Sequence, residues 1–502
     1  MFGLIDTRHI PLAAAALSLL TAVWLIYTDG IINRDGILYL QAAEFIARGN
    51  WSEALATYPW PFYPWLIAVV GLLTGLELEA AAYVLNALIQ ALIVYAFVRL
   101  VGEVGGDRAT LIAATLLILI SPEFNESRAQ VIRDFGYWAF FLLSLLFFIR
   151  YAKRSTWLNT VGWGAFMAVA FLFRIEGALF LFALPWALLL LKEYPWPVRL
   201  QRFAYAYLVG LLIVLLLFPI ILFYYGERDV QTQLLIPVYQ LIDFWAQLGS
   251  SIQAKAAILS EEVLNQYSSG YALPTVIGLL IFIFISTVVT ALHPVYALFA
   301  GYAFLTGAFR LRGHPGRIIV SWAALLAVLI IVGFLVPRFF LLSRYVMPLT
   351  LLLMIPASFG LAALYQQRRT LATQAGYRKW IFPGMVAALL YVAIDGLYST
   401  GASKTYLREA GLWLKRHTPV QSQVYSNSPI LAYYAGKGFE SIRSPWEWEQ
   451  SVRHSDQENI YIAINLKRNE PDSEKVLGIF FGKTPIAEFA NNKGDRAVIF
   501  QY

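Results

Sequence analysis

The chain has 502 residues, of which 59% are hydrophobic and only 14% are charged, whereas an ordinary soluble domain has about 25% charged residues. It has no cysteine, which excludes disulfide bonds, a thiolate nucleophile and cysteine-ligated zinc. The five histidines show no metal-ligand spacing; no metal site or cofactor is predicted, although carboxylates leave a divalent cation as an open alternative. The net charge of +7 does not indicate nucleic-acid binding, because the basic residues fall mainly in short loops between apolar segments.

Long apolar segments recur through the first 400 positions and predict a polytopic α-helical membrane protein. At roughly 20 residues a crossing, we expect about 11 to 13 spans. The segment 295–309 is interpreted as part of a hairpin or as an interfacial piece, because counting it would move the basic residues after 367 to the other side. The predicted crossings lie near residues 10–28, 79–100, 108–122, 135–151, 158–173, 177–191, 203–225, 272–291, 317–336, 345–364 and 380–399.

The orientation follows from the basic residues of the short loops, which all fall on one side of this scheme. The positive-inside rule makes that side cytoplasmic. We therefore expect an integral protein of the cell (inner) membrane with a cytoplasmic N-terminus, whose first helix is not cleaved because further spans follow it. The basic residues are Arg99, Arg108, Arg150, Lys153, Arg154, Lys192, Arg199, Arg202, Arg310, Arg312, Arg317, Arg368, Arg369, Arg378 and Lys379.

The composition changes after residue 400 to that of a soluble domain. Residues 1–400 therefore form the predicted membrane domain, and residues 401–502 form a small α/β domain that the span parity places outside the cytoplasm. We expect helices at 403–417 and after the Ser428-Pro429 cap, ending at Gly436. The expected strands lie at 423–426 and 460–466 and in a hairpin over 485–501 that turns at 491–494.

Two outer loops are long enough to be functional, 29–78 and 226–271. The first contains Asp35 where the chain leaves the first span, and a segment at 37–48 with helical apolar spacing that suits a membrane surface. It continues into the proline-rich aromatic segment 58–64. We interpret this loop as one wall of a site centred on Asp35, against the alternative of an ordinary solvated loop acid.

Five further charged residues lie at the predicted outer ends of spans: Asp134, Arg174, Glu176, Arg338 and Arg344. Asp134 can simply complement a helix dipole, and Arg174 and Glu176 can form a local ion pair. Arginine is uncommon in outer loops, and the planar guanidinium of Arg344, beside Tyr345, suits bidentate binding of a phosphate. The pattern therefore indicates a substrate with a phosphate at the surface and a tail in the lipid.

In order and spacing, the chain resembles the polytopic GT-C glycosyltransferases that use polyprenyl-phosphate sugars, the group that includes the protein O-mannosyltransferases and the lipid A aminoarabinose transferases. The segments that carry the resemblance are RDGILYLQAAEFIARGNW, YPWPFYPWLIAV, RDFGYWAFFLLSLL, FRIEGALFL, SRYVMPLTLLL and SNSPILAYYAGK. It implies that Asp35 is the catalytic base and that Asp134 is the second acid of the site. The aminoarabinose transferases have a Glu-Lys pair before the proline that aligns with Pro61, whereas this chain has Tyr58-Pro59-Trp60.

The expected function is that of an inverting glycosyltransferase, which moves a hexose or pentose from a polyprenyl-phosphate donor to an acceptor hydroxyl on the extracytoplasmic (periplasmic) face. Glycan, lipid and protein acceptors are all open. The alternatives are a lipid-linked glycan polymerase or ligase, a lipid-linked glycan transporter and a non-catalytic assembly factor. The expected donor-phosphate ligands are Arg344, Arg338 and Arg174, and the expected sugar or acceptor contacts are Tyr39, Tyr58, Tyr63, Glu176 and Tyr345.

Overall fold

The computed structural model describes residues 6–373, 376–398, 404–419, 421–438, 442, 459–469 and 484–501, without the side chains of 29, 217–218, 220–248 and 377. These residues form two compact units. The first unit contains residues 1–21, 87–127 and 133–397. The second unit contains 22–86, 128–132 and 398–502, so it joins the first outer loop to the C-terminal domain. Helices α1 (Ile10–Asp29) and α5 (Leu78–Glu103) have residues in both.

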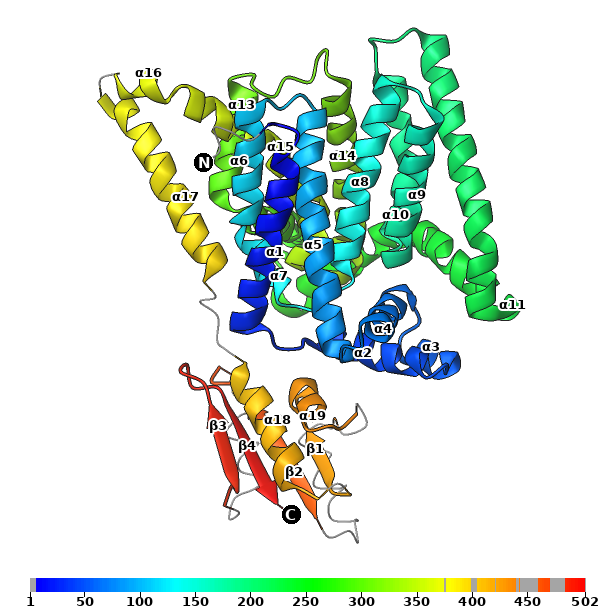
Figure 1. Cartoon of the computed structure of the whole chain (residues 1–502), viewed down its shortest axis with the longest axis vertical. Coiled ribbons are helices and arrows are strands. Elements are labelled where there is room, and N and C mark those ends of the chain that lie inside the picture. Colours follow the sequence, from blue (N-terminus) through cyan, green and yellow to red (C-terminus); the bar gives the residue numbers. More distant parts are fainter. Residues whose placement is uncertain are drawn as a thin grey trace. The chain divides into compact units, whose positions relative to one another are not determined.

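The first unit is a bundle of helices in which α6, α8, α14 and α15 lie side by side (Figure 1). In the described residues, eight helices are long and apolar enough to cross a membrane, or nine if the bent pair α6–α7 is one span. Shorter apolar helices lie at two further predicted crossings, 158–173 and 177–191. Another, α13, lies at 295–309, the segment predicted as a hairpin or an interfacial piece. The helices of this unit are α6 (Arg108–Leu119), α7 (Pro122–Arg128), α8 (Asp134–Lys153), α9 (Trp157–Phe173), α10 (Glu176–Ala183), η2 (Leu184–Leu190), α11 (Trp196–Ile258), η3 (Leu259–Val263), η4 (Ser269–Tyr271), α12 (Ala272–Leu292), α13 (Pro294–Leu305), α14 (Pro315–Arg338), α15 (Ser343–Gln366), α16 (Arg368–Ala372), η5 (Gly376–Trp380) and α17 (Ile381–Leu397).

The basic loops gather at one end of this bundle, which we call the basic end. Arg150 Nε donates to Glu103 at 2.8 Å, and Lys153 also pairs with Glu103. Arg317 Nε donates to the Val104 carbonyl at 3.1 Å, and the same side chain packs against two phenylalanine rings. Gln366 donates to Asp107 at 2.9 Å. The loops that the charge pattern predicts on one side are therefore together in space.

The structure differs from the prediction at α12 and α13. The segment predicted as a crossing, α12, lies across one end of the bundle, and the segment predicted as a hairpin or an interfacial piece, α13, passes through the bundle. The first half of α12 packs on the last turn of α14, and His293 at its other end lies 6.0 Å from Tyr391 of α17. Because Tyr296 then donates to the carbonyl of Leu117 near the end of α6, both ends of α12 lie at the end of the bundle opposite the basic end. The helix α13 runs from there to the basic end, where Tyr302 donates to Gln367.

Because α13 replaces α12 as a crossing, the number of crossings before residue 310 is unchanged, and the segments after it keep the sides predicted for them. Hydropathy does not distinguish an apolar helix that lies across the end of a bundle from one that passes through it. With 12 residues, α13 is also shorter than the roughly 20 residues of an ordinary crossing.

The second unit begins with three helices in the loop predicted at 29–78: α2 (Arg34–Ala47), α3 (Trp51–Thr57) and α4 (Phe62–Thr74). The helix predicted at 37–48 is confirmed as α2, but its apolar side chains, which the sequence assigned to a membrane surface, are buried within the protein, and α2 packs against α4. Asn50 caps α3, and Gly75 ends α4 with a φ of 72°, a conformation that favours glycine.

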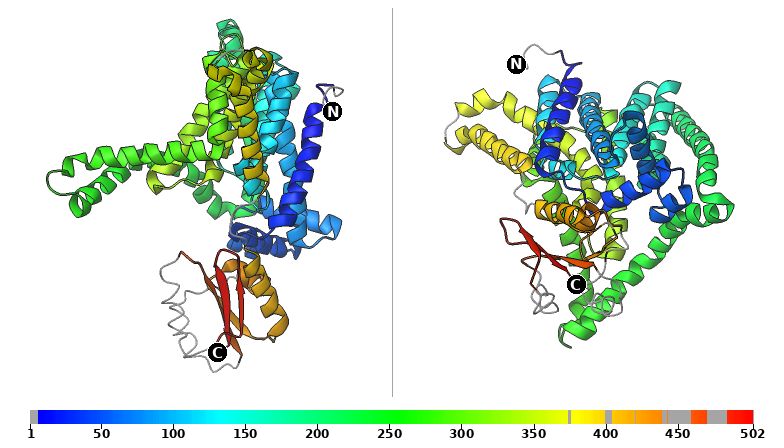
Figure 2. Two further views of the ribbon diagram at one scale, coloured as in Figure 1. Left: turned by 90° about the vertical axis from the view of Figure 1, so that its left-hand side faces the viewer. Right: turned by 60° about the horizontal axis from the view of Figure 1, so that its bottom comes forward.

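The C-terminal part of this unit is a four-stranded sheet in the order β1-β2-β4-β3, with α18 (Thr405–His417) on one face (Figure 2). The strand pair β1–β2 is parallel, and the other two pairs are antiparallel. All of the predicted elements in the described residues are confirmed. They are β1 (Gln423–Ser426), α19 (Pro429–Tyr434), β2 (Ile460–Leu466), β3 (Ala487–Ala490) and β4 (Arg496–Gln501).

The contact between α13 and α15 generates a prediction. A Cβ built on Gly360 would lie 1.9 Å from the Phe299 carbonyl oxygen, so the two backbones touch at this glycine. We expect Gly360→Ala to cost about 1–3 kcal/mol by forcing the helices apart, measured as a lower thermal unfolding midpoint in detergent. Gly301→Ala on α13 is the matched control, since a Cβ there meets nothing within 4 Å. An equal loss in both variants would contradict the close-packing explanation.

Candidate functional site

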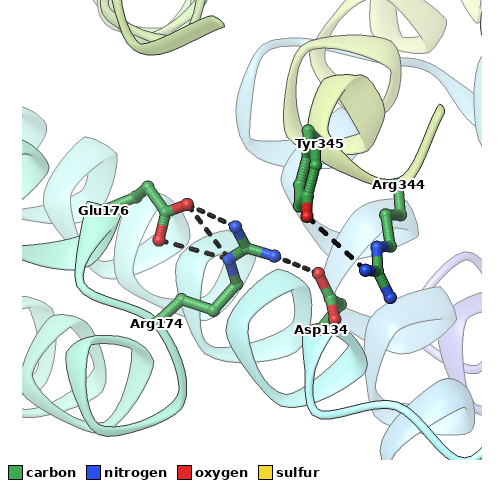
Figure 3. Close-up of polar contacts among 5 residues, drawn as sticks. All are labelled: Asp134, Arg174, Glu176, Arg344 and Tyr345. Atoms are coloured by element: carbon green, nitrogen blue, oxygen red, sulfur yellow. Dashed lines mark hydrogen bonds and ion pairs between the residues drawn. The ribbon is translucent and has the colours of Figure 1, made fainter. Parts of the chain in front are cut away.

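In the first unit, the structure brings together three of the predicted site residues from three helix termini (Figure 3). Asp134 is the first residue of α8, Arg174 follows the last residue of α9, and Glu176 is the first residue of α10. Arg174 Nε donates to both carboxylate oxygens of Glu176, at 3.1 and 3.2 Å. Its Nη1 donates to Asp134. The local ion pair predicted for Arg174 and Glu176 is therefore confirmed, and Asp134 joins it.

These charges are largely removed from water. The side chains of Arg174 and Asp134 are only 11% and 4% exposed. Burial opposes the charge of Arg174, but the coulombic attraction of Glu176 and Asp134 outweighs it and raises the pKa of Arg174 well above its usual value. Arg174 therefore remains a cation, and its guanidinium is committed to two carboxylates.

Arg344 and Tyr345 lie in the first turn of α15, beside this group. Arg344 Nη2 lies 3.5 Å from the Tyr345 hydroxyl, and the guanidinium carbons of Arg174 and Arg344 lie 5.0 and 5.3 Å from the centre of the Tyr345 ring. Tyr345 therefore lies between the two arginines and within cation–π distance of both. We call Asp134, Arg174, Glu176, Arg344 and Tyr345 the charged cluster.

Four members of the charged cluster line a cavity: Arg174, Glu176, Arg344 and Tyr345. The cavity has about 30 Å³ of space open to water-sized molecules, which is room for only a few waters. Its other walls are aromatic and aliphatic: Tyr137, Trp138, Phe180, Ala327, Ile330, Ile331, Phe334 and Pro348. The cavity thus combines cations with an apolar lining.

Arg338 lies outside the lining of this cavity. It is exposed at the end of α14, with its guanidinium 4.2 Å from the centre of the Phe334 ring. The centres of the Phe334 and Tyr345 rings lie 4.3 Å apart with the ring planes tilted by 48°, so Arg338 is connected to the charged cluster through these two rings.

Carboxylates do not form a metal cage here. In the part of the chain that the structure describes, no group of three His, Asp or Glu side chains is arranged to hold a metal ion. The two acids of the charged cluster lie on opposite sides of the Arg174 guanidinium instead.

In the second unit, Asp35 lies in the first turn of α2, where the helix dipole favours an acidic side chain. The start of this helix is fixed by its neighbours. Asn33 accepts a 2.8 Å hydrogen bond from the Val131 N–H. A Cβ on Gly36 would lie 2.9 Å from both Asn33 Oδ1 and Val131 Cβ, so only glycine allows this approach.

The three predicted tyrosines of this loop form one aromatic group. The rings of Tyr58 and Tyr63 each meet the Tyr39 ring edge-on, at 4.9 and 5.1 Å. Tyr63 is fully buried and donates to Asn86 at 2.8 Å, and Tyr39 is 4% exposed. Tyr58 is half-buried. Tyr63 therefore anchors the loop to Asn86 of α5, and Tyr58 is the tyrosine of the three that is most exposed to solvent.

Sequence reasoning missed Glu79 and the role of two tyrosines in the segment SNSPILAYYAGK. Tyr433 and Tyr434 donate to the two carboxylate oxygens of Glu79, at 3.0 and 3.1 Å. The contact joins residues more than 350 positions apart, so no local sequence pattern predicts it. The similarity of the segment SNSPILAYYAGK to the GT-C family was the only sequence signal that pointed to these two tyrosines.

The charged cluster generates a prediction about stability. Arg174→Met leaves the buried Asp134 and the partly buried Glu176 without their guanidinium. We expect a loss of about 3–5 kcal/mol, measured as a large fall in the unfolding midpoint. Arg338→Met is the control, because this exposed arginine contributes about 1 kcal/mol at most. Similar midpoints for both variants would refute the idea that Arg174 holds the helix termini together.

Comparisons with known proteins agree with this fold. Residues 58–223 match the family model described as dolichyl-phosphate-mannose-protein mannosyltransferase. No curated protein sequence is significantly similar to the chain. The solved structure of ArnT from Cupriavidus metallidurans bound to undecaprenyl phosphate is similar to 98% of this chain over 97% of its own length, with 15% identity and a TM-score of 0.59.

A second similar structure is the oligosaccharyltransferase AglB from Archaeoglobus fulgidus, in complex with an inhibitory peptide and a dolichol-phosphate. The match covers 93% of this chain and 71% of that one, with 13% identity and a TM-score of 0.55. Identities this low establish the fold alone. The resemblance to the GT-C glycosyltransferases is thereby confirmed: this integral membrane protein has their fold over almost its whole length, and part of it matches one of their family models.

Proposed function

We propose that the protein is an inverting glycosyltransferase that moves a sugar from a polyprenyl-phosphate donor to an acceptor hydroxyl on the extracytoplasmic face of the membrane. The observation that carries the proposal is the cavity at the charged cluster, which joins arginines to an apolar lining within a GT-C fold. The similar structures were solved with undecaprenyl phosphate and with dolichol-phosphate, which are lipids of the proposed donor class.

The chemistry assigns one task to each kind of residue. The acceptor oxygen attacks the anomeric carbon, and the bond from that carbon to the phosphate oxygen breaks, with its electron pair leaving on the lipid phosphate. Asp35 takes the acceptor proton. Arg344 binds the phosphate and stabilises the charge that develops on it. Because a single displacement occurs, the anomeric configuration inverts.

Arg344 is preferred to Arg174 as the main phosphate ligand. The guanidinium of Arg174 already satisfies Glu176 and Asp134, so we assign it to holding the cavity wall and assisting electrostatically. Arg338 assists from the exposed side. Since the cavity has room for only a few waters, the proposal requires Tyr345 and Arg344 to move apart when the donor binds. Tyr58 and Tyr345 offer rings to the sugar.

The role of Asp35 is tested by Asp35→Asn in purified, membrane-inserted protein with a panel of synthetic polyprenyl-phosphate sugars. We expect kcat to fall by roughly 10²–10⁴-fold, the usual contribution of a positioned base. Glu44→Gln on the same helix is the control, because Glu44 is exposed and pairs with Arg48 at the surface. If Asp35→Asn turns over at a near-normal rate, Asp35 is not the base. Transport of the intact donor without sugar transfer would instead support a transporter.

The role of Arg344 is tested by the affinity for polyprenyl phosphate in detergent. Losing charge-assisted hydrogen bonds to a phosphate costs about 1.5–3 kcal/mol each, so Arg344→Ala should weaken binding by about 10- to 100-fold. The exposed Arg338→Ala should weaken it less, and acceptor binding should be unchanged in both. Unaltered lipid affinity in Arg344→Ala would exclude it as the phosphate ligand.

A further inference from the structure

The contacts between the C-terminal domain and the loop that carries Asp35 include the buried hydroxyl of Tyr434. Tyr434 OH accepts a 3.2 Å hydrogen bond from the Ile32 N–H, and the same hydroxyl donates to Glu79 Oε1 at 3.1 Å. Ile32 is fully buried, and Tyr434 is 8% exposed. Tyr434 therefore connects three segments of the second unit: the turn before α2, the start of α5, and α19.

Tyr434 is itself held firmly by the C-terminal domain. A Cβ on Gly411 of α18 would lie 2.6 Å from Tyr434 Cβ and 2.7 Å from the Leu431 carbonyl, so the two helices touch at that glycine. The Tyr433 ring meets the Tyr434 ring edge-on at 5.2 Å, and the Arg408 guanidinium lies 5.6 Å from the centre of the Tyr434 ring. The hydroxyl thus has a fixed position relative to the sheet.

On the other side, Ile32 leads directly into the start of α2. Asn33 occupies the N-cap position of α2, where its side chain makes no capping hydrogen bond and instead accepts one from the Val131 N–H. Asp35 follows in the first helical turn, and Gly36 packs against Val131. Two anchors therefore hold the backbone on the N-terminal side of Asp35, the Val131 N–H at Asn33 and the Tyr434 hydroxyl at Ile32.

We propose that Tyr434 is a positioning residue for Asp35, through which the C-terminal domain sets the orientation of the first turn of α2. The proposal rests on the proposed function only for its kinetic consequence. Its structural part, that the hydroxyl orders the segment 31–40, stands independently.

The adjacent Tyr433 and Tyr434 differ in one contact, so Tyr433 provides a matched control for Tyr434. Tyr433 donates only to Glu79 in the contacts above, whereas Tyr434 both donates to Glu79 and accepts from the backbone that leads to Asp35. Burial and the nearby Glu79 carboxylate raise the pKa of Tyr434 to about 12, so the hydroxyl remains protonated and able to donate at physiological pH.

The experiment compares Tyr434→Phe with Tyr433→Phe and Glu79→Gln in the full-length protein in detergent. Amide hydrogen exchange over residues 31–40 reports the local order, and steady-state sugar transfer reports kcat and KM. We expect Tyr434→Phe to speed exchange at Ile32 and in the first turn of α2, and to lower kcat at least about tenfold with KM within about twofold, as a misoriented catalytic group does. Tyr433→Phe and Glu79→Gln keep the acceptor for Ile32 and should remain within about threefold of the unaltered kcat.

The outcomes separate this proposal from the function it builds on. If exchange and kcat in Tyr434→Phe match the unaltered protein, or if all three variants lose kcat equally, the positioning role is refuted. If the unaltered protein transfers no sugar from any donor in the panel, the proposed function fails and hydrogen exchange alone decides. Faster exchange confined to Tyr434→Phe would then support the positional contact, and unchanged exchange would overturn it.

Discussion

A buried carboxylate requires a positive partner, and Arg174 supplies one to two carboxylates at the point where α8 and α10 begin and α9 ends. Removing such charges from water is costly unless their geometry and hydrogen bonds compensate for it. The bidentate contact with Glu176 and the bond to Asp134 meet that condition. Three helix termini are therefore fixed relative to one another, and the cavity with Arg344 and Tyr345 forms beside them.

The same arrangement gives Arg174 and Arg344 different surroundings. A guanidinium that already contacts two carboxylates has little capacity to bind a further anion, whereas Arg344 faces an aromatic ring and the cavity. This difference supports the sequence-based prediction of Arg344 as the main donor-phosphate ligand, with Arg174 and Arg338 assisting.

In the second unit, the loop that carries Asp35 is built into a folded domain. Its helices are buried against one another, its tyrosines pack edge-on, and its entry is bonded to Tyr434 of the C-terminal domain. A loop anchored in this way presents a side chain in a defined direction, which positioned base catalysis requires. The small C-terminal domain thus contributes to the order of the proposed catalytic loop.

The sequence alone determined the membrane class, the basic end of the bundle, the α2 helix and nearly every described element of the C-terminal domain. Each of these depends on local periodicity, capping or charge, which neighbouring residues encode. Only the tertiary structure decided that α13 rather than α12 crosses the bundle, that Asp134 joins Arg174, and that Glu79 meets Tyr433 and Tyr434. These outcomes depend on contacts between segments 40 to more than 350 residues apart, where packing and charge pairing, rather than local pattern, choose the partner.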